Sequence, residues 1–305
     1  MAQALSINPR MAGMSHLPWN ERDLVQLLTL TPVAPGQWRS RHGDPNLNGR
    51  SYGGQLLGQA LMAGLMDVPE DRAPTMMQFL FLQGAMPQEA LDLHVTSLQE
   101  GKRFSSRHVR GVQGERVILD AQVSCALPLA APFHAAPSSA PSDEHPETLP
   151  RLAEVDPELV RGLQRLGGYS ENAKSSVEFR IPDSRRQFAP EAMDGRFRFW
   201  LRPAQTLPDD PRLHAAAFAY LSDWWLNFSS LGLHLQGLGE RRLYVASLNH
   251  AIWLHRPFRG DQWLHVETVS PAGVSGRGLS FGSVHDRAGQ LLATTSQECL
   301  MAYAE

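Results

Sequence analysis

Cysteine is scarce in this chain of 305 residues, which contains only Cys125 and Cys299, without a paired spacing. That excludes a disulfide framework and a cysteine-based zinc site, and it favours a reducing compartment, so we expect a cytoplasmic protein. The formal net charge is −3, so no basic field attracts nucleic acid or an anionic membrane. No apolar run reaches the ~20 residues that a bilayer requires. Neither nucleic acid nor a membrane is therefore expected as a partner.

The most apolar stretch, residues 50–67 (RSYGGQLLGQALMAGLMD), predicts a helix that is buried on nearly every side. Only Gln55 and Gln59 are strongly polar within it, and a helix that is apolar all round has to be buried. Ser51 is a suitable N-cap. Gly53 and Gly54 leave the first-turn amides uncovered at the positive end of the helix dipole. A core helix without a function of its own explains the stretch equally well.

Strand patterns follow this helix, and the second half of the chain repeats the arrangement. Alternating segments occur before residue 129 and again after residue 240, and PRLHAAAFAYLSDWW predicts a second buried helix. LHVTSLQEG from Leu93 matches LHVETVSPAG from Leu264, and CAL at Cys125 matches CLM at Cys299. Similarity that keeps its order predicts two copies of one unit.

The expected division is a tail at residues 1–22, a first unit at 23–129, a linker at 130–150 and a second unit at 151–305. The linker (APFHAAPSSAPSDEHPE) is rich in Pro, Ala and Ser and cannot form a packed core. The tail lacks the continuous apolar segment of a secretory signal.

Two familiar kinds of catalytic motif are not supported. GLSFG at residues 278–282 fits the G-x-S-x-G nucleophile elbow, but Ser280 lies inside an alternating strand pattern and no suitable Asp and His follow it. The twelve histidines include no HExxH, and His250, His255 and His265 alternate in parity along strands. No metal site is expected.

Asp223 is the only side chain between His214 and His234 that is charged at neutral pH when exposed to water. A carboxylate in so apolar a segment is costly unless it is hydrogen-bonded or functional. It could cap a short helix that begins at Trp224, or it could be a functional acid. The neighbouring residues do not decide between these interpretations.

Six segments, taken together and in order, resemble a known family: NGRSYGGQLLGQAL, EGKRFSSRHV, YLSDWW, VASLNHAIWLHRPF, SGRG and TTSQECLM. They are similar to the acyl-CoA thioesterase II family, whose members are double-hotdog proteins, over residues 27–301. The resemblance implies an α+β fold in which two antiparallel sheets each wrap around a central helix. It also implies an acyl-CoA substrate, with no metal and no cofactor. The Trp and Met content expected on the outer sheet face favours a homodimer or homotetramer.

The resemblance places a catalytic trio on Asp223 in YLSD, Ser247 in VASLNH and Gln297 in TSQE. Odd residues of 243–251 share one strand face, as do odd residues of 291–301, so Ser247 and Gln297 can both face the helix. Asp223 would activate or hold a water molecule, and the other two residues would orient it.

The first half carries no matching trio, because Val123 or its neighbour occupies the Gln position. The resemblance therefore implies an asymmetric pseudo-dimer with its chemistry on the second half. Asn249 and Gln78 depart from the residues usual in the family, Asp and His. Neither belongs to the trio, so these departures bear on substrate preference.

Four residues are candidates for substrate binding. The amides of Gly53 and Gly54 could stabilise an oxyanion, and Arg103 and Arg256, at strand ends or turns, could contact the phosphates of coenzyme A. Solvated loop charges are the simpler interpretation of each arginine. Two other functions stay open: an acyl-CoA hydratase or dehydratase, which would use an Asp–His pair, and a non-catalytic acyl-CoA-binding protein. The acyl chain length does not follow from the sequence.

Overall fold

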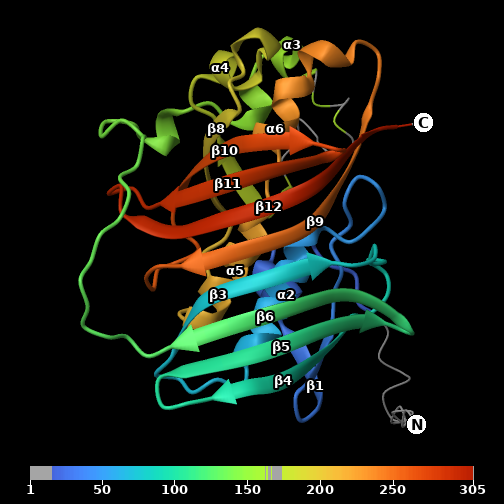
Figure 1. The fold of residues 1–305 in the computed structure, drawn as a ribbon, viewed down its shortest axis with the longest axis vertical. Helices are drawn as coiled ribbons and strands as arrows, with labels where there is room; N and C mark the ends of the chain where they lie inside the picture. The colour runs from blue at the N-terminus through green and yellow to red at the C-terminus, as the bar shows by residue number, and fades with distance from the viewer. Residues whose placement is uncertain (1–15, 162, 164–165, 167–173, 305) are drawn as a thin grey trace.

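A computed structural model describes residues 16–161, 163, 166 and 174–304. Most of the predicted tail, residues 1–15, lies outside these ranges. Twelve strands form one continuous antiparallel sheet in the order β1-β2-β4-β5-β6-β3-β9-β12-β11-β10-β8-β7 (Figure 1).

The elements follow the predicted order along the chain. The first half contains α1 (Leu24–Leu28), β1 (Leu30–Ala34), β2 (Gln37–Ser40), α2 (Gly53–Leu65), β3 (Ala73–Phe81), β4 (Asp92–Glu100), β5 (Phe104–Gln113) and β6 (Arg116–Ala126). The second half begins with η2 (Pro146–Thr148), η3 (Leu152–Glu154), α3 (Pro157–Val160), β7 (Val177–Arg180), α4 (Ser184–Phe188), η5 (Pro190–Ala192) and β8 (Arg196–Pro203). It continues with α5 (Pro211–Ser222), α6 (Phe228–Leu231), η6 (Gly232–His234), η7 (Gln236–Leu238), β9 (Leu243–Leu254), β10 (Leu264–Val274), β11 (Arg277–His285) and β12 (Leu291–Tyr303).

The strand order is the same when read outward from the centre in either direction. In the first half β3 is followed by β6, β5 and β4, and in the second half β9 is followed by β12, β11 and β10. The two inner strands pair directly, with Phe79 opposite His250 and Met77 opposite Ile252. This pairing satisfies two edges that would otherwise be open. The predicted double hotdog is confirmed, with its two sheets fused into one.

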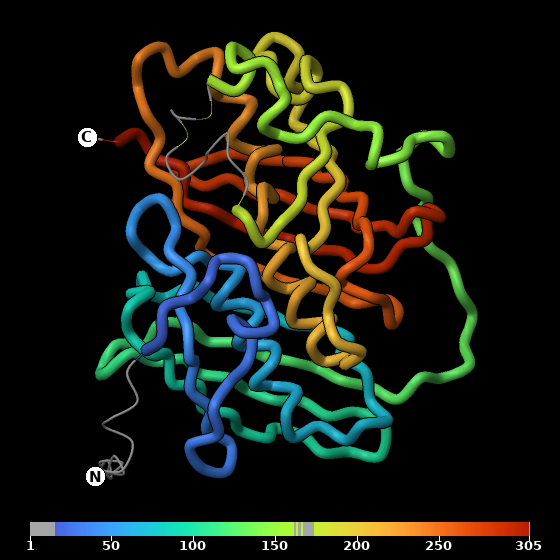
Figure 2. The backbone as a smooth tube through the Cα atoms, turned by 180° about the vertical axis from the view of Figure 1, so that it is seen from behind, coloured from blue at the N-terminus to red at the C-terminus, as the bar shows by residue number. Residues whose placement is uncertain are grey.

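The long helices α2 and α5 cover the same face of the sheet and run antiparallel to each other (Figures 1 and 2). A Cβ at Gly54 would lie 2.2 Å from the Tyr220 carbonyl oxygen, and a Cβ at Gly58 would lie 2.9 Å from that of Ala216. Glycine at these positions therefore allows the backbones to approach closely.

The predicted N-cap of α2 is wrong by one residue, because Tyr52 precedes the first helical residue and makes no side-chain capping bond. The two polar residues of the helix are structural. The Gln55 side-chain carbonyl accepts from the Asp44 amide at 2.6 Å, and Gln59 Nε2 donates to the Leu27 carbonyl oxygen at 2.8 Å. The first bond holds the loop before α2 against the helix, and the second joins α1 to it. Both satisfy polar groups that burial would otherwise penalise.

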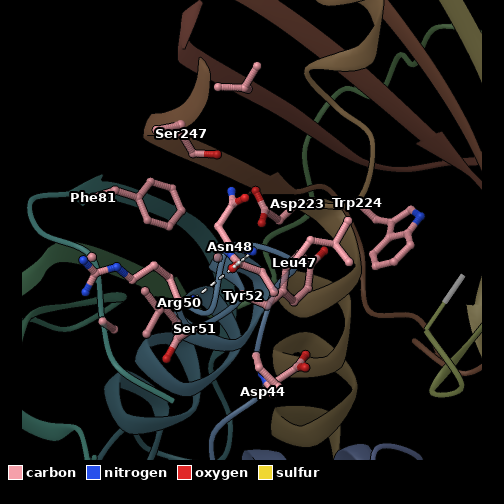
Figure 3. Close-up of a pocket in the computed structure, with 18 of the residues that line it drawn as sticks. Asp44, Leu47, Asn48, Arg50, Ser51, Tyr52, Phe81, Asp223, Trp224 and Ser247 are labelled. Carbon is pink, nitrogen blue, oxygen red and sulfur yellow. Dashed lines mark hydrogen bonds between the residues drawn. The ribbon is translucent and has the colours of Figure 1, made fainter. Parts of the chain in front are cut away.

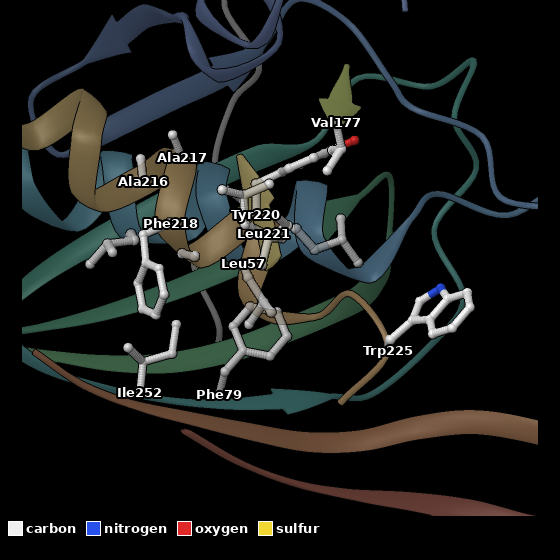
Figure 4. Packing of buried hydrophobic residues seen from close by; sticks show 14 of the residues in the cluster. Leu57, Phe79, Val177, Ala216, Ala217, Phe218, Tyr220, Leu221, Trp225 and Ile252 are labelled. Carbon is white, nitrogen blue, oxygen red and sulfur yellow. The ribbon is translucent and has the colours of Figure 1, made fainter. Parts of the chain in front are cut away.

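The core lies between the helix pair and the sheet (Figure 4). Leu57 of α2 and Phe218 and Tyr220 of α5 are fully buried, together with Phe79 and Ile252 of the two central strands. Each such side chain contributes about 1.5–3 kcal/mol through removal of apolar surface from water. The core therefore spans both halves, and neither helix is buried by its own half alone.

The segment expected to be a linker, residues 130–150, contains no strand, and it runs from the β6 end of the sheet to the second half (Figure 1). It nevertheless makes specific contacts. Glu144 Oε1 accepts from Arg198 Nη1 at 2.9 Å and from Trp200 Nε1 at 2.7 Å. We propose that the chain consists of a first unit at residues 23–129, a linker at 130–150 and a second unit at 151–305. The linker docks on the second half of the sheet.

No helix within the described ranges is both long enough and apolar enough to cross a membrane.

Candidate active site

Asp223 is the C-cap of α5. The interpretation of Asp223 as the N-cap of a helix starting at Trp224 is wrong, since the next helix, α6, begins only at Phe228, after Asn227. Between them Trp225 has φ of 60°, a left-handed conformation that bulky residues rarely adopt. This turn ends α5 with the half-buried Asp223 carboxylate directed at the start of α2 (Figure 3).

A β-bulge in β9 shapes the rest of the site. Gln297 of β12 pairs with His250, but Cys299 pairs with Ser247, so Leu248 is an extra residue on β9. The parity prediction is correct for Ser247 and fails beyond the bulge, where His250 and Ile252 are the buried residues. Because a bulge redirects the strand by one residue, Ser247 and His250 both reach Gln297.

The Gln297 side chain links the two other residues of the predicted trio. Gln297 Nε2 donates to Asp223 Oδ1 at 2.8 Å and to Ser247 Oγ at 2.5 Å. The Gly54 backbone amide, in the first turn of α2, is a further donor to the Asp223 carboxylate. The three side chains, predicted from separate parts of the sequence, therefore form one hydrogen-bonded group.

His250 belongs to this group and was not predicted from the sequence. Its Nδ1 lies 3.1 Å from Gln297 Oε1, and its Nε2 lies 3.0 Å from Ser222 Oγ. Because Gln297 Oε1 can only accept, His250 donates from Nδ1. Its Nε2 faces the Ser222 hydroxyl, whose single proton is also directed at the Ala219 carbonyl oxygen at 2.9 Å. The bond from Nδ1 fixes which end of the Gln297 amide faces Asp223. Strand parity placed His250 on the face opposite to Ser247. Its inward position could be predicted only by someone who already knew of the bulge.

Burial sets the ionisation of the two titratable groups. Desolvation raises the pKa of Asp223 to about 7, although the hydrogen bonds from Gln297 and the Gly54 amide act in the other direction. Desolvation lowers the pKa of His250 to about 4. Near neutral pH the histidine is therefore uncharged, while the carboxylate changes between its protonated and ionised forms, as suits a general base.

A cavity of about 970 Å³ opens onto Asp223 and Ser247. Both halves contribute to its wall: the start of α2, the end of β3 at Phe81, the turn at Trp224 and residues 244–248 of β9 (Figure 3). The loop over residues 44–51 closes one side. The volume is within the range of pockets that hold small organic ligands.

A buried polar cluster holds this loop against α5. The Tyr220 hydroxyl donates to Asp44 Oδ2 at 3.0 Å, and Lys174 forms an ion pair with the same carboxylate. Burial raises the pKa of Asp44, with Lys174 opposing the effect. The cluster joins three separate parts of the chain beside the cavity, and it was not predicted from the sequence.

The four predicted substrate-binding residues are placed differently. Gly53 lines the cavity, and Gly54 lies beside it with its amide directed at Asp223. Arg103 and Arg256 are not among the residues that line this cavity, and Arg256 instead donates to Gln290. Their part in substrate binding stays a prediction, which the cavity does not support.

In the first half, Val123 stands at the position that Gln297 occupies in the second. It is buried against Gly64 of α2, where its Cγ2 would lie 3.0 Å from a Cβ on that glycine. An apolar contact therefore replaces the amide.

Both halves of the chain match family models. Residues 42–126 match the acyl-CoA thioesterase N-terminal domain, and residues 137–301 match the acyl-CoA thioesterase C-terminal domain. A similar solved structure is the acyl-CoA thioesterase II TesB2 from Mycobacterium marinum, with a TM-score of 0.75 and 28% identity over 93% of this chain and 99% of that one. The fold and the matched domains define a double-hotdog thioester hydrolase.

The chain belongs to the acyl-CoA thioesterase II family. It is 28% identical to acyl-CoA thioesterase 2 of Haemophilus influenzae, over 93% of this chain and 98% of that protein. It is also 28% identical to acyl-coenzyme A thioesterase 8 of Mus musculus, over 90% of this chain and 87% of the relative. The family expected from the sequence is confirmed.

Proposed function

We propose that this enzyme hydrolyses acyl-CoA to a free carboxylic acid and coenzyme A, with Asp223, Ser247 and Gln297 directing the attacking water. The observation that carries the proposal is the Gln297 amide, which donates to both Asp223 and Ser247 at the edge of the cavity. Asp223 accepts a proton from the water as the water oxygen attacks the thioester carbonyl carbon. The tetrahedral intermediate then collapses, the carbon–sulfur bond breaks, and the sulfur leaves with the proton.

In this scheme Gln297 and Ser247 orient the Asp223 carboxylate and the attacking water. The amide of Gln297 holds the carboxylate in place, and the hydroxyl of Ser247 is a second polar group for the water. Such positioning and general-base catalysis each account for large rate factors, about 10²–10⁴-fold for the base. We assign the oxyanion to the Gly53 amide at the start of α2, where the helix dipole favours negative charge.

The composition of the cavity wall supports a position for each part of the substrate. Leu56, Phe81 and Trp224 provide an apolar surface for the acyl chain, and Arg50 is a cationic group on the cavity wall. We assign a phosphate of coenzyme A to Arg50. Arg50→Ala should raise KM several-fold at low salt with kcat unchanged, and the difference should shrink as ionic strength rises. A KM that does not change in this variant would contradict the assignment.

The trio is tested by measuring thiol release from acyl-CoA substrates of increasing chain length. Asp223→Ala should lower kcat by at least about 10²-fold, and Ser247→Ala and Gln297→Ala by smaller factors, with folding unchanged by circular dichroism. Thr294→Ala is the matched control, because it removes a hydroxyl of β12 that lies 3.1 Å from His255 Nε2 and does not contact the trio. A folded Asp223→Ala variant with near-normal turnover would refute the mechanism.

The same purified protein separates the other two functions considered above. Hydration of crotonyl-CoA would favour a hydratase, and acyl-CoA binding without thiol release would favour a binding protein. His250 contacts an amide and a hydroxyl, so it lacks the carboxylate partner that an Asp–His pair requires.

We further infer a homodimer or homotetramer and a cytoplasmic location. The apolar side chains of Leu80, Trp253 and Phe281 are exposed on strands of the sheet, and exposed apolar surface favours self-association. Sedimentation equilibrium at micromolar concentration tests the assembly, and a monomer would contradict it. The two free, buried cysteines agree with a reducing compartment, and fractionation of the native cells tests the location.

A further inference from the structure

Two histidines and a glutamate come together on the outer face of the second half, away from the catalytic cavity. His265 of β10 pairs across the ladder with His285 of β11, and Glu267 lies two residues further along β10, on the same face. Both rings are fully buried and Glu267 is half-buried. The sequence alone predicts no metal site, because residues that are far apart in the chain meet here only through the strand register.

The ligand atoms face one another at short range. Glu267 Oε1 lies 3.2 Å from His265 Nδ1 and 3.8 Å from His285 Nδ1, and one ligand atom from each residue lies within 4.8 Å of the others. Ligand atoms around a tetrahedral zinc ion, with bonds of about 2.0–2.2 Å, are roughly 3.3–3.6 Å apart. Ser138 Oγ is 3.0 Å from His265 Nδ1 and 3.1 Å from Glu267 Oε1, so a further oxygen lies beside two of the three ligand atoms.

The hydrogen bonds around His285 leave a lone pair directed at a carboxylate. Its Nε2 faces the Ala136 carbonyl oxygen at 3.4 Å and therefore carries the proton, since a carbonyl oxygen only accepts. Its Nδ1 is then an acceptor, and it is buried without a hydrogen-bond partner within the described residues. Two acceptors that face each other in a buried site repel unless a cation lies between them. An orienting bond on the far nitrogen, which metal-bound histidine commonly has, is present for His285, whereas Nε2 of His265 is buried without a partner among the described residues.

We propose that His265, Glu267 and His285 bind a divalent transition-metal ion, zinc first, with the Ser138 hydroxyl or water as the fourth ligand. Imidazole nitrogen and carboxylate oxygen suit zinc better than magnesium or calcium. Residues 136–139 cover the site, where the Ser139 amide donates to Glu267 Oε1 at 2.6 Å. The site is closed by this segment, so the ion is structural and fastens the docked linker to the second sheet.

The repeat provides an internal comparison. In the first half His94 pairs with Arg110, as His265 pairs with His285, and Thr96 stands where the second half has Glu267. One nitrogen ligand is therefore kept, while a cation and a neutral hydroxyl replace the other two. These three positions of the first half therefore form no equivalent site, and His94→Ala is a matched control for the loss of one sheet histidine.

The experiment is titration of the chelator-treated full chain with Zn²⁺ by calorimetry, and with Co²⁺ by visible absorption. We expect one ion per chain, tetrahedral Co²⁺ bands, a higher Tm and slower proteolytic cleavage within residues 130–140. Glu267→Gln and His285→Ala should weaken binding by more than about 100-fold, and His94→Ala should leave it unchanged. Thioester hydrolysis by the Glu267→Gln variant reports whether the fold is intact.

Either of two results would overturn the proposal. One is the absence of stoichiometric binding to the wild-type chain, in which case a proton and not a metal lies between the histidine and the glutamate. The other is Zn²⁺ affinity that is the same in Glu267→Gln as in the wild type, which would mean adventitious binding to surface histidines.

Discussion

Replacing Asp223 with asparagine should remove activity and at the same time stabilise the fold. Burial raises the pKa of this carboxyl from 3.8 to about 7, which means that the folded state disfavours the ionised form. A difference of this size corresponds to up to about 4 kcal/mol. Asparagine has nearly the same shape and carries no charge, so it removes this penalty. The group is thus an example of a site at which function costs stability.

The sign of the effect depends on pH in a defined way. Above pH 7 the carboxyl is ionised in both the folded and the unfolded chain, and the folded wild type carries the whole penalty. Between pH 7 and pH 4 the folded state takes up a proton before the unfolded state does, and the penalty shrinks. Below pH 4 both states are protonated. The stability advantage of Asp223→Asn should therefore be largest near pH 8 and nearly absent near pH 4.

The assay is urea unfolding of both proteins at pH 4.5, 6, 7 and 8.5, monitored by tryptophan fluorescence, together with thiol release at each pH. Any constant difference caused by the changed hydrogen bond with Gln297 cancels in the pH dependence. Wild-type kcat/KM should rise with pH through about 7, because the ionised carboxylate is the active form. A stability difference between the two proteins that does not grow between pH 4.5 and pH 8.5 would refute the reasoning.

Three further outcomes test other parts of the structure. Gly53→Ala should lower kcat at least about 10-fold, since the new Cβ would lie 2.5 Å from the catalytic carboxylate. Gly237→Ala is the control, because no atom lies within 4 Å of its Cβ. Equal turnover in the two variants would contradict the expectation. His250→Ala should lower kcat about 10–100-fold with little change in KM, because the Gln297 amide loses its orienting bond; an unchanged kcat would show that the bond is dispensable. Cys125 and Cys299 are buried, and burial raises the pKa of each thiol to about 11. An aromatic disulfide reagent should therefore label neither cysteine until urea is added. Rapid labelling of the native protein would contradict this burial.

The sequence by itself determined the parts of this protein that depend on local periodicity. The apolar composition of residues 53–65 requires a helix that is buried all round, and alternation identified the long strands of both halves. The isolated Asp223 was recognisable because no other charge lies near it in the sequence. The ordered motifs led to the family and thereby to Ser247 and Gln297.

Tertiary structure alone decided which side chains meet. The single extra residue at Leu248 turns His250 inward, and no local pattern marks such a bulge. The cavity wall takes residues from both halves, and the pairing of β3 with β9 brings those halves together. His265, Glu267 and His285 became neighbours through strand register and the path of the linker. Periodicity fixes the face on which a side chain lies, whereas contacts between distant segments depend on register and packing, which emerge only when the whole chain folds.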